Sequence, residues 1–335
     1  MKAAYVFGPR DVRVVEVPKP AIQRPDDVVV KVKACGVCPF DLRIYLGLFK
    51  GKYPIPVGHE VAGIVEEVGK DVTHVSPGDV VILDAMIRCG VCRYCRRGLD
   101  NLCERKGPLP NGFAEYIRIP SRYVYKASKT IDFIELALCE PLACCVNAVE
   151  KAGELLPGDI VHIIGAGPIG LMFLKLFKFM GLRTIVSEVL EHRIRAAERC
   201  GADLVLNPKA DNVEKEILGF TQGYGVDVTV LTATTKETFS LALRTTAKAG
   251  TVLLFAARYP SITVELDPNI VHFKELKIIG VEGRTTKQFY KAFRLITTRA
   301  VVLRDIVSHV LRLDEIKEAF ETALAREGLK VVVTP

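Results

Sequence analysis

Apolar and polar residues alternate along the first third of the chain, which is the pattern of β-strands that bury one face. The apolar runs are short, and prolines and glycines separate them. We therefore expect an irregular antiparallel β-domain in this part of the chain. Its expected strands are Lys2–Phe7, Val12–Val17, Val28–Ala34, Val61–Val68 and Val80–Leu83.

The pattern changes after Gly158, where the apolar runs become continuous, as in strands buried on both faces of a parallel sheet. These runs alternate with helical segments, which predicts a doubly wound α/β sheet. The expected strands are Ile160–Ile164, Arg183–Ser187, Leu204–Leu206, Val226–Leu231, Thr251–Phe255 and Leu276–Gly280, and the expected helices are Leu171–Met180, Leu190–Cys200, Lys236–Lys248 and Lys287–Thr298. Because chain ends often meet, we expect the strand Val307–Leu313, the helix Asp314–Ala325 and the strand Leu329–Val333 to return to the first domain.

A glycine-rich motif lies between the first of these buried strands and the helix after it. Gly165, Gly167 and Gly170 have the spacing G-x-G-x-x-G, with Pro168 and Ile169 inside the motif. The first glycine allows a tight turn, the second lets a pyrophosphate approach the backbone, and the third lets helix and strand pack closely. Because the motif has a strand before it and a helix after it, it predicts a dinucleotide-binding site.

The next strand ends at Glu188, where a carboxylate can accept hydrogen bonds from the ribose hydroxyls of a dinucleotide. A negative charge there favours NAD over NADP, although Arg183 and Arg193 lie nearby in sequence and would weaken the preference. We expect NAD as the cofactor and include Arg193 among the residues that bind it. The structural alternative for Glu188 is an exposed carboxylate at the end of a strand.

Four closely spaced cysteines predict a metal site between the strands of the first domain. Their spacing is C-x2-C-x2-C-x7-C, and four thiolates can close a tetrahedral shell around a structural zinc ion. An iron–sulfur cluster is the alternative. Basic residues surround the cysteines and would balance the charge of the thiolates; we favour this role over nucleic-acid binding, because no aromatic stacking platform accompanies them. The cysteines are Cys89, Cys92, Cys95 and Cys103.

A second metal site is predicted from Cys38, His59 and Glu60, a thiol, an imidazole and a carboxylate from separate loops. Three protein ligands and one open position are the arrangement of a catalytic zinc site. Glu140 precedes Pro141, which suits the first position of a helix. Its carboxylate is either a fourth, exchangeable zinc ligand or a residue that the helix dipole stabilises.

Composition and charge exclude several classes of protein. The chain has 335 residues, 49% of them hydrophobic and 25% charged, and a net charge of +7 without a run of five like charges. It therefore lacks a polybasic segment for nucleic acid or membrane, and its most apolar stretch is too short to span a bilayer. Ten cysteines in a chain without a signal peptide point to metal or thiol chemistry, so we expect a cytoplasmic protein.

Taken together, these motifs resemble those of the zinc-dependent medium-chain dehydrogenases/reductases over nearly the whole chain, particularly the sorbitol, polyol and threonine dehydrogenases. The resemblance implies a GroES-like catalytic domain at 1–146 with a zinc lobe at 88–104, a Rossmann domain at 147–285 and a return at 286–335. It also implies two zinc ions per chain, hydride transfer to NAD(P), and a homodimer or homotetramer. The matching segments are Gly36-Val37-Cys38, Gly58-His59-Glu60, the four-cysteine lobe, Gly112–Tyr116, Glu140–Ala143, Gly165–Gly170 and Leu329–Val333.

Two positions depart from the family pattern. A Ser or Thr usually follows the zinc cysteine by two residues as the start of a proton relay, and a His often lies three residues further on; here these positions are Phe40 and Arg43. The loop from Glu104 to Asn111 is also short for the family. We expect an NAD-dependent dehydrogenase of a secondary alcohol, a polyol or sugar. The alternatives are L-threonine or a simple diol as substrate, and a zinc-stabilised nucleotide-binding protein without turnover.

Overall fold

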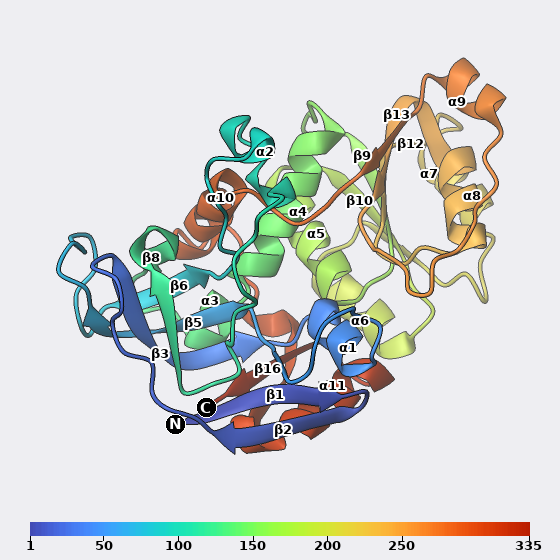
Figure 1. Cartoon of the computed structure of the whole chain (residues 1–335). Coiled ribbons are helices and arrows are strands. Elements are labelled where there is room, and N and C mark those ends of the chain that lie inside the picture. Colours follow the sequence, from blue (N-terminus) through green and yellow to red (C-terminus); the bar gives the residue numbers. More distant parts are fainter. The chain divides into compact units, whose positions relative to one another are not determined.

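The structure, a computed structural model, describes residues 1–335, which form two compact units. The first unit comprises residues 1–143 and 284–335, and the second comprises residues 144–283. Figure 1 shows the elements of both units in chain order. No helix of the chain has the length and the apolar character needed to cross a bilayer.

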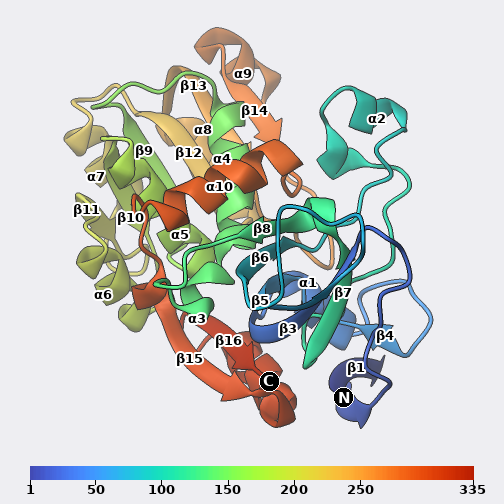
Figure 2. The same cartoon turned by 90° about the vertical axis from the view of Figure 1, so that its left-hand side faces the viewer.

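The first unit is built on a seven-stranded sheet with β3 (Asp27–Gly36) at its centre. This strand pairs antiparallel with β5 (Glu60–Val68), β7 (Tyr116–Pro120) and β16 (Lys330–Thr334), so the last strand of the chain lies beside an early one. The two chain ends lie close together in both views (Figures 1 and 2). The remaining strands of the sheet are β6 (Val80–Asp84), β8 (Val124–Lys126) and β15 (Val307–Arg312); β1 (Lys2–Gly8), β2 (Asp11–Glu16) and β4 (Ile55–Pro56) form a smaller sheet.

Helix α11 (Ile316–Ala325) covers the core of the first unit with a buried aromatic residue, Phe320. Its ring meets Tyr45 and Phe113 edge to face, with centroids 5.3 and 5.7 Å away. Such contacts attach the returning chain to helix α1 (Pro39–Tyr45) and to the loop that holds Phe113 by apolar packing. The other helices of this unit are α1 (Pro39–Tyr45), α2 (Arg93–Arg96), α3 (Phe133–Leu136) and α10 (Thr286–Thr297), with short 3-10 turns η1 (Asp100–Leu102), η2 (Ser121–Tyr123), η3 (Arg304–Ile306) and η4 (Leu313–Glu315).

The second unit contains the predicted doubly wound parallel sheet, in the order β11-β10-β9-β12-β13-β14. The strand order reverses between β9 and β12, which is the Rossmann arrangement. Helices α7 and α8 lie together on one face of the sheet (Figure 1). The strands are β9 (Ile160–Ile164), β10 (Arg183–Ser187), β11 (Leu204–Leu206), β12 (Val226–Leu231), β13 (Thr246–Leu254) and β14 (Lys277–Gly280); the helices are α5 (Pro168–Phe179), α6 (Glu191–Arg199), α7 (Val213–Phe220), α8 (Lys236–Thr245) and α9 (Pro268–Lys274).

The predicted strands are present, and some helix boundaries differ. The structure also has elements that were not predicted, which include β4, β7, β8, α1, α7 and α9. Helix α8 ends at Thr245 and β13 begins at Thr246, so the end of the helix expected at Lys236–Lys248 is strand. Helix α4 (Cys139–Ala152) begins before Pro141, which places Glu140 inside the first turn rather than before it. Proline is tolerated there because N–H groups of the first turn have no partner within the helix.

Candidate active site

Cys38, His59 and Glu60 lie together in the first unit, with one ligand atom of each within 4.8 Å of the others. Cys38 is the N-cap of α1, and Glu60 is the first residue of β5. Ligands held at about 2.0–2.3 Å from a tetrahedral zinc ion lie roughly 3.3–3.8 Å from one another, so this group is close to the required geometry. A soft thiolate, an imidazole and a carboxylate are also the donor set that zinc accepts.

Asp41 holds two of these residues in place, and sequence reasoning missed it. Its buried carboxylate accepts hydrogen bonds from the N–H groups of Cys38 (3.0 Å) and Gly58 (2.9 Å) and lies 3.5 Å from His59 Nδ1. Gly58 has a φ of +94°, and a Cβ there would lie 2.6 Å from the backbone of Phe113, so only glycine fits. A carboxylate behind a metal-binding histidine orients the ring and fixes its tautomer.

Glu60 forms a buried ion pair with Lys330, which was also missed. Lys330 Nζ lies 2.7 Å from Glu60 Oε1 and donates a further bond to Val37 O at 2.8 Å. Both side chains are nearly inaccessible to solvent, at 1% and 4% exposure. A Cβ on Gly36 would clash with the Glu60 carboxylate, so the glycine makes room for the pair.

Burial and neighbouring charges oppose one another at this site. Burial raises the pKa of Cys38, while the His59 imidazole lowers it. Burial lowers the pKa of His59, but the charges of Asp41 and Cys38 outweigh it and raise that pKa well above its usual value. Burial also raises the pKa of the Glu60 carboxyl, against the effect of Lys330. The thiol and imidazole thus stabilise each other's charged forms in the absence of a metal ion; binding a metal would require the Cys38 thiolate together with a neutral His59 imidazole.

The structure does not bring Glu140 into this group of metal-ligand atoms. Its carboxylate oxygen Oε1 lies 2.8 Å from Arg284 Nη1, and both side chains are buried. Glu140 is near enough to Glu60 for its charge to contribute to the raised pKa of Glu60, after the effects of burial and Lys330. Arg284 is a further residue that sequence reasoning missed.

Phe40 and Arg43 lie on α1, directly after Cys38. The Phe40 ring meets the ring of His59 edge to face at 5.9 Å and the ring of Phe49 at 5.5 Å. Arg43 lies with its guanidinium carbon 5.7 Å from the Phe49 ring and donates to Leu48 O at 3.3 Å. The position of the usual relay hydroxyl is therefore occupied by an apolar ring packed against the histidine.

The four cysteines of the lobe form a second group, again with sulfurs within 4.8 Å of one another. The N–H of Cys92 donates to Cys89 Sγ at 3.3 Å and that of Cys89 to Cys103 Sγ at 3.4 Å. Hydrogen bonds from the N–H groups of Val91 and Cys92 lower the pKa of Cys89 to about 6, which favours the thiolate. Four sulfur ligands would fill all four positions around a tetrahedral metal ion and leave none open, as in a structural metal site.

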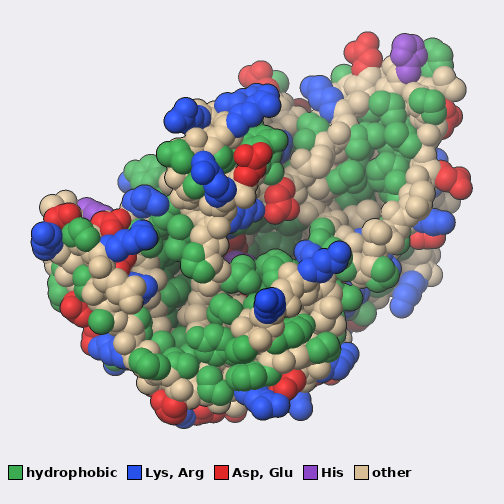
Figure 3. All heavy atoms as spheres, in the orientation of Figure 1, with side chains coloured by type: hydrophobic (Ala, Val, Ile, Leu, Met, Phe, Trp, Pro, Cys, Tyr) green, Lys and Arg blue, Asp and Glu red, His purple; other side chains and the backbone are tan.

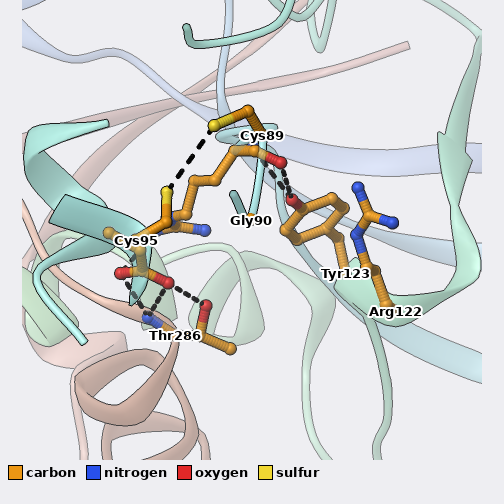
Figure 4. Close-up of a pocket in the computed structure, with 8 residues that line it drawn as sticks. Cys89, Gly90, Cys95, Arg122, Tyr123 and Thr286 are labelled. Carbon is orange, nitrogen blue, oxygen red and sulfur yellow. Dashed lines mark hydrogen bonds and ion pairs between the residues drawn. The ribbon is translucent and has the colours of Figure 1, made fainter. Parts of the chain in front are cut away.

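A pocket of about 350 Å³ opens beside this lobe (Figure 4). In Figure 4 the sulfurs of Cys89 and Cys95 face one another, and their separation is 4.0 Å. The Tyr123 hydroxyl accepts from the N–H of Arg88 and donates to its carbonyl. The surface of the lobe is basic, and Lys and Arg side chains gather there in Figure 3. The exposed arginines on α2 and at its end are Arg93, Arg96 and Arg97.

The glycine motif of the second unit has the geometry of a dinucleotide-binding turn. Gly165 has a φ of +103°, and a Cβ on Gly170 would lie 1.9 Å from the Gly165 carbonyl oxygen. Gly167 is the N-cap of α5, and Pro168 and Ile169 are its first residues. The backbone N–H groups at this helix start offer an anion site for a pyrophosphate.

Glu188 and Arg193 both lie beside this turn. Glu188 Oε2 accepts from the N–H of Ala166 at 2.8 Å, and Oε1 accepts from the N–H groups of Val189 and Leu190. A Cβ on Gly167 would be 3.4 Å from Arg193 Nη1, which places this guanidinium over the motif. Glu188 is 7% exposed, so it is not the freely solvated carboxylate of the alternative interpretation.

Matches to known proteins cover both units. Residues 24–129 match the family model of the alcohol dehydrogenase GroES-like domain, and residues 168–298 match that of the zinc-binding dehydrogenase. The chain is 36% identical to an L-threonine 3-dehydrogenase of Pyrococcus horikoshii, over 99% of the chain and 97% of the relative. It is 30% identical to the sorbitol dehydrogenase of Bacillus subtilis, over 100% and 97%. A solved structure from Sinorhizobium meliloti 1021, described as a zinc-binding dehydrogenase bound to NADP, superposes with a TM-score of 0.94 at 32% identity and covers 100% of this chain and 99% of that one.

Proposed function

The chain belongs to the zinc-dependent medium-chain dehydrogenase/reductase family, and on this premise we propose that it transfers a hydride from a secondary alcohol to NAD. It is an oxidoreductase, since the relatives that it matches over their length are dehydrogenases. The observation that carries the proposal is the grouping of Cys38, His59 and Glu60 within 4.8 Å in a chain that also holds a dinucleotide-binding turn.

Cys38 and His59 would hold a zinc ion, with Glu60 as a direct or water-bridged third ligand. Bound there, zinc would supply Lewis acidity that polarises the substrate oxygen and lowers the pKa of its hydroxyl. Asp41 orients Cys38 and His59 through its three contacts, and Lys330 holds the Glu60 carboxylate. The four cysteines of the lobe would hold a second, structural zinc ion.

Alcohol oxidation releases a proton, and the residues of this chain restrict its route. Phe40 has no group that can carry a proton, and Arg43 keeps its proton throughout the accessible pH range. The route we propose runs through a water at Glu60 or Glu140, or through a second hydroxyl of the substrate itself. A carboxylate within reach of one bridging water meets the geometric requirement for a general base.

For the cofactor we propose NAD, because the negative charge of Glu188 would repel a 2′-phosphate. A carboxylate offers about four lone pairs, and three of them accept the backbone N–H groups of Ala166, Val189 and Leu190. One therefore remains for a ribose hydroxyl. Arg193, over Gly167, would face the pyrophosphate.

For the substrate we propose a polyol or sugar. The hydroxyl next to the one being oxidised would replace the proton-relay hydroxyl that is absent because position 40 is phenylalanine. L-Threonine is the second candidate, because several relatives at 33–36% identity are L-threonine 3-dehydrogenases. Both are secondary alcohols with a polar neighbouring group. We further propose a homodimer or homotetramer, and a reducing cytoplasmic location, which suits a chain with ten cysteines.

The test is NADH formation from a panel of polyols, sugars, L-threonine and simple alcohols, measured by absorbance with zinc-loaded protein. His59→Ala is the matched variant, since it removes one proposed ligand and leaves the dinucleotide turn intact. We expect turnover with at least one secondary alcohol and a loss of at least about 100-fold in His59→Ala. Turnover that His59→Ala retains, or none with any alcohol, would contradict the proposal.

A further inference from the structure

A buried network of charges connects Glu140 to the cysteine lobe within the first unit. At its centre is Asp84, the last residue of β6, which is fully buried. Its oxygen Oδ1 accepts from Arg284 Nη2 at 2.7 Å, and Oδ2 accepts from Arg88 Nη1 at 2.6 Å. Arg284 contacts Glu140 with its other terminal nitrogen, so four side chains alternate in charge from Glu140 to Arg88.

The lobe end of this network is next to a predicted metal ligand. Arg88 immediately precedes Cys89 and is 3% exposed. Besides Asp84, its guanidinium donates to the carbonyl oxygens of Met86 (2.9 Å) and Arg284 (3.0 Å). One side chain thus binds the carboxylate that holds Arg284 and the backbone of Arg284 itself.

Asp100 makes a second connection between the lobe and the same segment. It lies in η1, between the cysteines of the lobe, and its Oδ2 accepts from the Thr286 hydroxyl at 2.7 Å. The Thr286 N–H points to the same carboxylate, and Arg88 Nε lies 3.5 Å from it. Thr286 begins α10, two residues after Arg284, and lines the pocket of Figure 4 together with Cys89.

In such a network the loss of one side chain affects the positions of the others, because none of the buried charged groups can be solvated by water instead. Removing one partner of a buried charge pair leaves the other uncompensated. The Arg88 guanidinium donates to three acceptors from two separate nitrogens, an arrangement that the single nitrogen of an ammonium group does not reproduce. Loss of Arg88 therefore leaves Asp84 Oδ2 and the Arg284 carbonyl without their donor. Asp84 is then held by Arg284 alone, so it no longer fixes the guanidinium that contacts Glu140.

We propose that Arg88 is a positioning residue for Glu140, acting through Asp84 and Arg284, and that it thereby couples the four-cysteine site to the site of Cys38. The lobe then has a role beyond stabilising the fold, because an ordered lobe loop holds Arg88 and thereby fixes the position of the Glu140 carboxylate near Glu60. This inference rests on the proposed function only for the measurement of kcat and KM. The rate of metal release tests it without requiring that the protein oxidises an alcohol.

The experiment compares Arg88→Met, Arg88→Lys, Glu140→Gln and the double variant Arg88→Met/Glu140→Gln. The control is Arg122→Met, which removes an arginine from the same pocket; Arg122 is exposed and stacks on Tyr123 outside the network. The first readout is the rate of zinc release to a chromogenic chelator. The kinetic phase that the unchanged protein shows and His59→Ala lacks is assigned to zinc at the Cys38 site. The second is kcat and KM with the best alcohol.

Arg88→Met and Glu140→Gln should each speed zinc release from the Cys38 site and lower kcat/KM by about 10- to 100-fold, as changes behind metal ligands do. The double variant should be no worse than the more affected single variant, because both act through one carboxylate. Arg88→Lys should resemble Arg88→Met, and Arg122→Met should stay within about twofold of the unchanged protein. If Arg88→Met does not fold, Arg88→Lys and Asp84→Asn take its place in the same cycle.

Two results would overturn the inference: additive losses of kcat/KM in the double variant, or an unchanged rate of zinc release from the Cys38 site in Arg88→Met. Either result would mean that Arg88 stabilises the fold without acting on Glu140. If the unchanged protein oxidises no alcohol while the release phases remain coupled, the proposed function fails and this inference stands. If it turns over normally and Arg88→Met alters neither readout, this inference alone fails.

Discussion

Replacing Lys330 with methionine should destabilise the protein strongly, because it leaves the Glu60 carboxylate buried without its cation. At the observed 2.7 Å, two unit charges attract by about 6 kcal/mol for an effective dielectric constant of about 20. Desolvation of the two ions offsets most of this energy, so the intact pair contributes little net stability. The single variant keeps the desolvation cost of Glu60 and loses the attraction, for a net loss of about 3–5 kcal/mol.

The assay is calorimetric unfolding with every variant made in the His59→Ala background, since a zinc ion bound beside Glu60 would replace the cation that Lys330 supplies. A loss of this size should lower Tm by roughly 6–20 °C, at about 2–4 °C per kcal/mol for a unit of this size. The matched control is Glu60→Gln/Lys330→Met, which removes both charges and should be more stable than Lys330→Met alone. A decrease in Tm below about 2 °C for Lys330→Met, or a double variant less stable than the single, would refute the reasoning.

Four further outcomes follow from the other sites. Cys95→Ser should reduce the zinc content, measured by elemental analysis, from about two ions per chain to about one and lower Tm, since structural zinc contributes folding energy; iron in place of zinc would contradict this. Glu188→Ser should narrow the ratio of kcat/KM for NAD over NADP, and equal values in the unchanged protein would contradict the assignment. Phe40→Ser should raise kcat for simple alcohols more than for polyols; an unchanged ratio would show that the missing hydroxyl was never limiting. Burial lowers the pKa of His162 to about 3, so the unfolded chain, but not the folded one, takes up this proton below about pH 6.5. Stability should therefore fall between about pH 6.5 and 3, by up to about 1.4 kcal/mol per pH unit, and His162→Val should flatten this slope in pH-dependent unfolding.

Local patterns were sufficient for the parallel sheet of the second unit, whereas helices α7 and α9 were not predicted. The strands Ile160–Ile164 and Arg183–Ser187 have the predicted bounds, because a glycine lies shortly before each of them and Gly165 and Glu188 follow directly. The start of β13 was missed because Thr246–Gly250 is a short, mixed segment directly after a helix, where periodicity cannot separate the two structures.

In the candidate site, sequence spacing predicted the residues that sit in local motifs and missed those that arrive from elsewhere. Cys38 and His59 stand in recognisable short segments. Asp41 had a local signal that was not used, since it forms a capping box with the N-cap of α1. Lys330 lies in Leu329–Val333, a segment that matches the family, but nothing in that segment indicates a carboxylate partner; the pairing of β16 with β3 provides it. Arg284 is a single basic residue just before α10 and has no local signal.

The pairing of β16 with β3 has a consequence for how the protein is made. Synthesis proceeds from the N-terminus, so Cys38, His59 and Glu60 leave the ribosome long before Lys330, which lies in the last strand. Until β16 arrives, the Cys35–Gly36 end of β3 lacks its second partner strand and Glu60 has no buried cation. The second unit, complete at residue 283, can fold while the first unit still waits for its closing strand. The order of translation therefore makes the first unit, which holds the proposed catalytic metal site, the last part of the molecule that can become native.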